Sequence, residues 1–162
     1  MRILYTFLFF PILFFGQVCD SLQMQSLINI GPLQISEINE SMGLRNGTDY
    51  NGATIYYPIN QNNLSSIVLV PGFMNTELTI QNWGPFFASH GIITMTIGTN
   101  SLTDTHVQRR DALFDAIISL KQENQRIASP LFGKLDTSSI AVGGFSKGGG
   151  GAQLLAKFDP SL

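Results

Sequence analysis

The residues best suited to chemistry lie in the stretch GGFSKGGGG at positions 143–151. Within this stretch, Gly144, Ser146 and Gly148 form a G-x-S-x-G pattern. The pattern is typical of serine hydrolases, in which the serine occupies a sharp turn between a strand and a helix and attacks a carbonyl group. Glycines are needed beside the serine because bulkier side chains would collide in this strained turn. Ser146 is therefore the candidate nucleophile.

The segments on either side of the pattern have the composition that such a turn requires. Residues 139–143 (SIAVG) form a short apolar run, which predicts a buried strand. Residues 152–158 (AQLLAKF) are rich in alanine and leucine, which favour helix. The glycines at 149–151 would allow the start of this helix to pack closely against neighbouring strands.

A glycine-rich loop between a strand and a helix can also bind phosphate or serve as a purely structural turn. In a phosphate-binding P-loop the order Gly-Lys-Ser/Thr follows the glycines, whereas Lys147 precedes them here. The spacing G-x-G-x-x-G of dinucleotide-binding loops is not met either. The sequence context therefore favours a nucleophile.

A serine nucleophile also needs a histidine base and an acid. Neither His90 nor His106 has the sequence context of a catalytic base. Asp136 and Asp159 flank the pattern and are interpreted as surface turn residues, so no partner for Ser146 is evident among the residues considered.

Composition and charge argue against several other classes of function. The net charge is −2 and no cluster of basic residues is present, so nucleic acid is not an expected partner. Cys19 is the single cysteine, which excludes a disulfide within the chain. Cysteine and histidine do not occur with the spacing of a metal site, and we expect neither a metal nor another cofactor.

Residues 1–16 have the pattern of a signal peptide. Arg2 is followed by an almost entirely apolar segment that is too short to span a bilayer comfortably. Gly16 is the best candidate for the cleavage position, which would leave Gln17 at the mature N-terminus. No stable membrane span is expected, and the expected localisation is extracellular, with lipid attachment through Cys19 as the alternative.

The rest of the chain predicts a single domain in which strands and helices alternate. Residues 17–48 are polar and weakly patterned and are expected to form a leader with one edge strand near 33–38. Further strands are predicted at 53–57, 66–70, 92–97 and 139–143, and helices at 85–90, 106–125 and 152–158. The middle helix has an apolar face, which the sequence assigns to Val107, Leu113, Phe114, Ile117, Ile118 and Leu120. This alternation predicts a mostly parallel sheet flanked by helices.

Three stretches of the sequence resemble the secreted α/β-hydrolases of the cutinase and polyester-hydrolase group, which includes the polyethylene-terephthalate hydrolases and is related to dienelactone hydrolases. They are GATIYYPINQNNLSSIVLVPGF, NWGPFFASHGIITMTIGTNS and SPLFGKLDTSSIAVGGFSKGGGG. The most specific features are the four glycines after the serine and the Pro-Gly-aromatic loop at 71–73. The resemblance implies an α/β-hydrolase fold over residues 49–162, truncated after the turn that carries the nucleophile. It also implies that the acid and then the histidine follow on later strands, so we expect both to lie beyond Leu162 and this chain to be the N-terminal part of a longer hydrolase.

The resemblance also implies roles for three residues. Ser146 matches the nucleophile, and the backbone N–H groups of Phe73 and Lys147 match the oxyanion hole, which stabilises the negative oxygen formed during attack. Both side chains are expected to line the substrate cleft, although Phe73 could instead be a loop aromatic that covers the core. The implied activity is cofactor-free hydrolysis of short-chain esters or polyesters through an acyl-enzyme, by a protein that is monomeric when complete.

The sequence departs from the family's usual residues at three positions. Gly98 replaces an aspartate, Phe145 replaces a tryptophan or histidine, and Lys147 replaces a methionine. The cation at Lys147 is expected to favour substrates with carboxylate ends. Two alternatives remain open: a triacylglycerol lipase or acyl-sugar esterase on the same scaffold, and a non-catalytic binding protein.

The incompleteness of the catalytic set leads to an expectation about a polypeptide that ends at Leu162. Without a histidine base, Ser146 would stay protonated and weakly nucleophilic, so this polypeptide is expected to be inactive. The strand that contains Ile140 and Val142 would form an exposed apolar edge, so poor solubility is expected as well.

Overall fold

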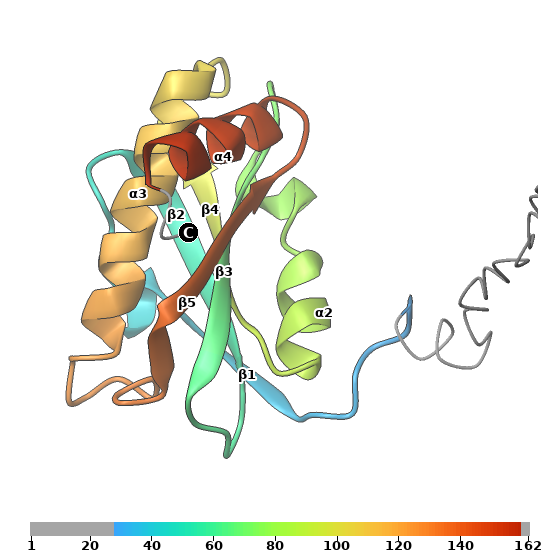
Figure 1. The fold of residues 1–162 in the computed structure, drawn as a ribbon, viewed down its shortest axis with the longest axis vertical. Helices are drawn as coiled ribbons and strands as arrows, with labels where there is room; N and C mark the ends of the chain where they lie inside the picture. The colour runs from blue at the N-terminus through green and yellow to red at the C-terminus, as the bar shows by residue number, and fades with distance from the viewer. Residues whose placement is uncertain (1–27, 160–162) are drawn as a thin grey trace, which may run out of the picture.

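The structure is a computed structural model that describes residues 28–159 (Figure 1). Its strands are β1 (Ile35–Asn39), β2 (Tyr50–Pro58), β3 (Leu64–Val70), β4 (Ile93–Thr99) and β5 (Leu135–Gly144). Its helices are α2 (Trp83–Ser89), α3 (His106–Glu123) and α4 (Lys147–Phe158), with short 3-10 helices η1 (Glu40–Met42) and η2 (Glu77–Thr79). The predicted signal peptide at 1–16 and Cys19 lie outside the described residues.

The five described strands form one sheet in the order β1-β2-β4-β3-β5. β2 runs antiparallel to both of its neighbours, β1 and β4. β3 runs parallel to both of its neighbours, β4 and β5. All strands except β2 therefore point in one direction, which confirms the predicted mostly parallel sheet and the predicted edge strand near 33–38.

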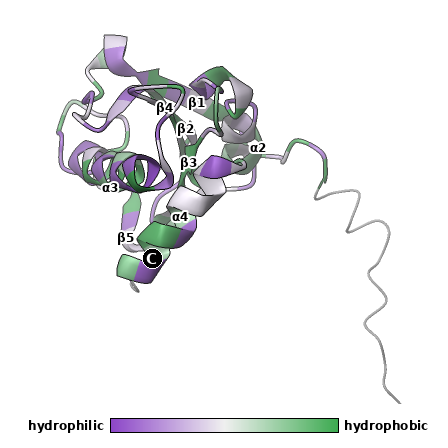
Figure 2. Ribbon diagram, turned by 90° about the horizontal axis from the view of Figure 1, so that it is seen from above, coloured by the Kyte–Doolittle hydropathy of each residue, from purple (hydrophilic) through white to green (hydrophobic). Residues whose placement is uncertain are grey.

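Helices cover both faces of the sheet. α2 packs on β2 and β4 on one face, and α3 and α4 pack against each other on the opposite face (Figures 1 and 2). The core lies mainly between the sheet and α3, where Val68, Met95, Leu113 and Leu120 are fully buried. No helix within residues 28–159 is both long enough and apolar enough to cross a membrane.

β5 is at the edge of the described sheet, but its large side chains are not exposed as predicted. β5 pairs only with β3 among the described strands. Ile140 is 5% exposed and belongs to the core, and Val142 packs against this core. Successive side chains of a strand point to opposite faces, so these two residues face inwards together while Ala141 between them is exposed. The expectation of an exposed apolar edge is therefore wrong for Ile140.

Gly98 in β4 permits a bulge in the neighbouring strand. The pairing of β2 with β4 shifts register between Tyr50 and Ala53, and Gly52 in this segment has a φ of 82°. A Cβ atom on Gly98 would lie 2.1 Å from the carbonyl oxygen of Asn51, which no side chain tolerates. An aspartate, the usual residue at this position in the resembling family, is therefore incompatible with the bulge.

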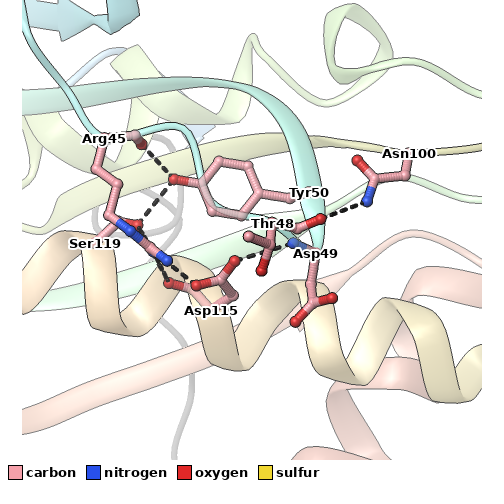
Figure 3. Close-up of polar contacts among 7 residues, drawn as sticks. All are labelled: Arg45, Thr48, Asp49, Tyr50, Asn100, Asp115 and Ser119. Carbon is pink, nitrogen blue, oxygen red and sulfur yellow. Dashed lines mark hydrogen bonds and ion pairs between the residues drawn. The ribbon is translucent and has the colours of Figure 1, made fainter.

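A buried carboxylate attaches the loop before β2 to α3 (Figure 3). Asp115 of α3 is 5% exposed, and its Oδ1 accepts a hydrogen bond from Arg45 Nη1 at 2.6 Å. Its Oδ2 accepts a hydrogen bond from the backbone N–H of Asp49 at 3.0 Å. Burial disfavours the charged form, but the hydrogen bonds from Asp49 and Arg45 outweigh it and hold the pKa of Asp115 below its ordinary value.

Three further hydrogen bonds in Figure 3 complete this attachment. The hydroxyl of Tyr50 donates to the carbonyl oxygen of Arg45 and lies 2.9 Å from the hydroxyl of Ser119. The side-chain amide of Asn100, directly after β4, donates to the carbonyl oxygen of Thr48 at 2.8 Å. The loop is thus tied both to α3 and to the carboxyl end of β4.

We expect Asp115→Asn to lower the free energy of unfolding at pH 7 by about 2 kcal/mol, because it removes the charged acceptor of Arg45 and Asp49. A carboxyl group with a lowered folded pKa stabilises the protein above its unfolded pKa of about 3.9, and this contribution is lost as the pH falls through the folded pKa. The variant should therefore lose less stability than the unmodified protein between about pH 5 and pH 2. Urea unfolding across this range measures both effects.

Asp111→Asn is the matched control on the same helix, because Asp111 pairs at the surface with the adjacent Arg110. Its effect on the free energy of unfolding should stay within about 0.5 kcal/mol. Equal effects of the two substitutions would contradict the role assigned to Asp115.

Candidate active site

Ser146 lies where β5 turns into α4, as its sequence pattern predicts (Figure 1). Its backbone has φ 52° and ψ −115°, a conformation that residues other than glycine rarely adopt. The N–H of Phe145 donates to the carbonyl oxygen of Val70 at 3.2 Å, and the N–H of Gly148 donates to that of Phe145 at 2.8 Å. The turn is therefore strained and is held against the carboxyl end of β3, as expected of a functional site.

Two glycines of the pattern are required by backbone contacts. A Cβ atom on Gly144 would lie 2.4 Å from the carbonyl carbon of Gly148. A Cβ atom on Gly148 would lie 2.4 Å from the carbonyl oxygen of Val70. Side chains at either position would separate the two ends of the turn or push it away from β3, so the predicted role of both glycines is confirmed.

The glycine run lies inside α4 rather than before it. The predicted helix at 152–158 begins at Lys147 in the structure, which places all four glycines in its first turns. A Cβ atom on Gly150 would lie 2.3 Å from the His106 ring, and one on Gly151 would lie 2.8 Å from Arg109 Cβ. Gly150 and Gly151 therefore allow α4 to approach the helix α3 and not the strands that the sequence predicts, whereas Gly149 lies against the end of β5.

The loop at 71–73 lies directly beside the candidate nucleophile. A Cβ atom on Gly72 would lie 3.2 Å from the Cβ of Ser146. Within residues 28–159, the backbone N–H groups of Phe73 and Lys147 donate no hydrogen bond. Two free donors therefore flank the turn that carries Ser146, and they are the two that the sequence predicts for the oxyanion hole.

The side chains of Phe73 and Lys147 contact each other next to this turn. Lys147 Nζ lies 4.3 Å from the centroid of the Phe73 ring, within the range of a cation–π interaction. Phe73 is 48% exposed, which excludes the alternative that it is a loop aromatic covering the core. Lys147 therefore covers one face of the Phe73 ring.

Neither histidine is hydrogen-bonded to Ser146 in the part of the chain that the structure describes. His90 caps the C-terminal end of α2, and its Nε2 lies 3.0 Å from the carbonyl oxygen of Asn29. His106 is the first residue of α3.

The two aspartates near the pattern are also separate from the candidate nucleophile. Asp159 follows α4, whereas Asp136 lies within β5 and not in the predicted surface turn. Asp136 accepts hydrogen bonds from the hydroxyl and the N–H of Ser138, and these bonds lower its pKa. No described acid is hydrogen-bonded to Ser146, and no group of three or more potential metal ligands is found within residues 28–159.

An apolar cavity of about 240 Å³ lies beside the turn, on the α2 face of β3. It is lined by Ile67, Leu69, Ile80, Trp83, Phe87, Gly144 and Phe145. Because Ser146, Phe73 and Lys147 do not line it, we do not assign this cavity to the reacting part of a substrate. Trp83 and Phe87 of α2 form one wall of this cavity, and Ile67 of β3, on the opposite wall, is only partly buried.

Arg109 is a residue of this region that sequence reasoning missed. It is fully buried in the first turns of α3 and donates a hydrogen bond to the carbonyl oxygen of Pro71, next to the candidate oxyanion loop. A signal was available, because Arg109 is four residues before Leu113 and so falls on the buried side of the helix. An arginine at such a position indicates a specific buried acceptor.

A strained serine lies between a strand and a helix, at the carboxyl end of a mostly parallel sheet that has helices on both faces. This arrangement is that of an α/β-hydrolase fold. The predicted fold class is thereby confirmed. Comparison with known families agrees: the PETase family model, described as PET hydrolase-like, matches residues 27–162. The chain belongs to this PET hydrolase-like family.

Individual relatives support the same assignment. The chain is 36% identical to Cutinase 1 of Thermobifida cellulosilytica over 132 residues, which cover 82% of this chain and 48% of that protein. It is also 36% identical to a cutinase of Thermobifida fusca (strain YX) over 132 residues, covering 82% and 42%. Lipase 1 of Moraxella sp. (strain TA144) is 34% identical over 130 residues, covering 78% and 38%. The chain thus spans less than half the length of these relatives.

Proposed function

We propose that the protein is a serine-dependent carboxylic ester hydrolase that acts on short-chain esters or polyesters. The observation that carries the proposal is the strained Ser146 beside the free N–H groups of Phe73 and Lys147. Membership of a PET hydrolase-like family and similarity to proteins named cutinase support the ester and polyester classes.

The proposed reaction proceeds through an acyl-enzyme and needs no cofactor. Ser146 Oγ attacks the ester carbonyl carbon while a base takes its proton, and the carbonyl electron pair moves onto the oxygen. The N–H groups of Phe73 and Lys147 would stabilise this oxyanion, each lowering the barrier by about 3 kcal/mol. When the carbonyl re-forms, the alcohol leaves with the proton, and water then releases the acid by the same steps.

We assign the base and the acid to polypeptide outside residues 28–159. No described histidine or acid is hydrogen-bonded to Ser146, and the matched relatives are more than twice as long as the aligned region. A polypeptide of residues 17–162 alone is accordingly expected to hydrolyse esters orders of magnitude more slowly than an enzyme with a complete triad. Secretion after removal of residues 1–16 remains our proposal for localisation, based on the apolar N-terminal pattern.

A triacylglycerol lipase is the second candidate, because one of the similar proteins is named a lipase. Labelling the full-length protein with a fluorophosphonate tests for an activated serine, and peptide mapping should place the label on Ser146. The rates on p-nitrophenyl acetate, a polyester film and an emulsified long-chain triglyceride then separate the substrate classes. Absence of labelling would favour a non-catalytic binding protein over both enzymes.

We expect Lys147→Met to weaken the preference for esters whose acyl group ends in a carboxylate. Lys147 places a cation over Phe73 beside the nucleophile, and its attraction for a carboxylate at an exposed site is about 1 kcal/mol, or roughly fivefold in kcat/KM. The measurement is the ratio of kcat/KM for a carboxylate-ended ester to that for a neutral ester of equal length.

Lys157→Met is the matched control for this substitution. Lys157 lies on the same helix and is exposed in its last turn, so the change in net charge is identical. The control should leave the ratio unchanged. An equal change in both variants would show that overall charge, and not the position over Phe73, sets the preference.

A further inference from the structure

Arg109 is a buried cation whose hydrogen bonds all go to backbone carbonyl groups. It is 0% exposed, and it forms no ion pair within residues 28–159. Its Nη1 donates to the carbonyl oxygen of Pro71 at 2.6 Å, its Nη2 to that of Leu102 at 3.1 Å, and its Nε to that of Asp104 at 3.3 Å. A guanidinium that is buried away from solvent is stable only when its N–H groups are hydrogen-bonded. The three carbonyl oxygens supply the acceptors that Arg109 needs.

These carbonyls belong to two loops that meet beside the candidate active site. Pro71 precedes the Gly72-Phe73 segment, whereas Leu102 and Asp104 lie between β4 and α3. The loops are also joined directly, because the N–H of Met74 donates to the carbonyl oxygen of Leu102 at 2.8 Å. Met74 has a φ of 59°, an unfavourable conformation that persists only where the surroundings impose it. Arg109 is thus the side chain that holds the two loops together.

Arg109 also contacts the helix that begins after the nucleophile. A Cβ atom on Gly151 of α4 would lie 2.8 Å from the Arg109 Cβ, so the helices touch at this point. A Cβ atom on Gly148 would lie 2.6 Å from the Pro71 carbonyl oxygen, the same oxygen that accepts from Arg109. Arg109 therefore touches both parts of the proposed oxyanion hole: the loop that carries the Phe73 N–H and the helix that starts with the Lys147 N–H.

We infer that Arg109 is a positioning residue for the oxyanion hole, which rests on the function proposed above. By fixing the Pro71 carbonyl, Arg109 also restrains the next peptide group, between Gly72 and Phe73. The N–H of this group is the Phe73 donor of the proposed oxyanion hole. The planar guanidinium supplies donors in diverging directions and so reaches three acceptors on two loops. A lysine keeps the charge but presents a single nitrogen, which cannot reach the three carbonyls at once.

The test compares Arg109→Lys with Arg110→Lys in the full-length protein. Arg110 is the adjacent residue on α3 and pairs with Asp111 at the surface. For Arg109→Lys we expect kcat on p-nitrophenyl acetate to fall about 10- to 100-fold with KM within about twofold, because the oxyanion exists only in the transition state. Hydrogen exchange at the backbone amides of 72–75 should become faster. Arg110→Lys should change neither measurement.

Two results would overturn the inference. One is a lowered melting temperature with unchanged kcat at temperatures where Arg109→Lys is folded, which indicates a purely structural role. The other is unchanged exchange at 72–75, which shows that the loop does not depend on the guanidinium. The hydrogen-exchange measurement does not require catalysis, so it tests the role of Arg109 even if the unmodified protein shows no Ser146-dependent hydrolysis. Absence of that hydrolysis would contradict the proposed function and not the role of Arg109.

Discussion

Replacing Ser146 with alanine should lower the rate of ester hydrolysis at least about 1000-fold and leave the melting temperature almost unchanged. The loss of rate follows because the substitution removes the only atom that could form the acyl-enzyme. The stability should be retained, within about 0.5 kcal/mol, for two reasons. Alanine keeps the Cβ atom and hence the same backbone strain at φ 52°, and the Ser146 hydroxyl has no hydrogen-bond partner within residues 28–159 whose loss would matter.

The measurement is kcat on p-nitrophenyl acetate together with a thermal melt. Ser139→Ala, on the strand β5 that precedes Ser146, is a suitable control, because within residues 28–159 the Ser139 hydroxyl is hydrogen-bonded to that of Ser65 on β3, at 2.8 Å, and not to the candidate site. This control should retain full activity. If Ser146→Ala kept more than about a tenth of the rate, Ser146 could not be the nucleophile.

Replacing Gly148 with alanine should destabilise the protein by about 3 kcal/mol or prevent folding. Its Cβ atom would lie 2.4 Å from the carbonyl oxygen of Val70 and 2.6 Å from that of Pro71. Both are backbone atoms at the end of β3, so neither can yield by changing a rotamer. The helix would have to move away from the sheet, and Ser146 would move with it. Urea unfolding monitored by circular dichroism gives the change in free energy.

Gly149→Ala distinguishes this steric conflict from a general effect of altering the glycine run. A Cβ atom on Gly149 would lie 3.1 Å from the carbonyl oxygen of Gly144, and its next neighbour is 3.9 Å away. This tight contact is offset by the higher helix propensity of alanine, which is worth about 1 kcal/mol. We therefore expect a change near zero. Similar losses of stability for both variants would contradict the proposed cause.

The turn that carries Ser146 was predictable because its determinants are local. A strand, two glycines, a serine and a helix within about twenty residues specify it without any distant contact. The contact of Lys147 with Phe73 and the hydrogen bonds of Arg109 are different. They join segments near positions 71–73, 102–104, 109 and 147, which only the folded chain brings together. No local pattern encodes such contacts.

The buried face of α3 was predicted only in part, for a related reason. Leu113, Ile117 and Leu120 are buried as predicted, whereas Val107, Phe114 and Ile118 are at least partly exposed. Apolar residues surround much of this helix, so periodicity alone does not show which side meets the sheet. Packing selects the side that carries Ala112, Ala116 and Arg109, because small residues permit close approach and the arginine finds its carbonyl acceptors there.

The glycine run in α4 has a consequence for the order in which the protein folds. Each of the four glycines disfavours helix by about 1 kcal/mol relative to alanine, so α4 is not expected to form in an isolated peptide. Its helical state depends on contacts with α3 and with the end of β3, which must therefore be in place first. The strained conformation of Ser146 then arises only in the last stages of folding. Before that stage, we expect residue 146 to be an ordinary serine in a flexible glycine-rich segment, so any reactivity that depends on the strained turn would appear only with the finished tertiary structure.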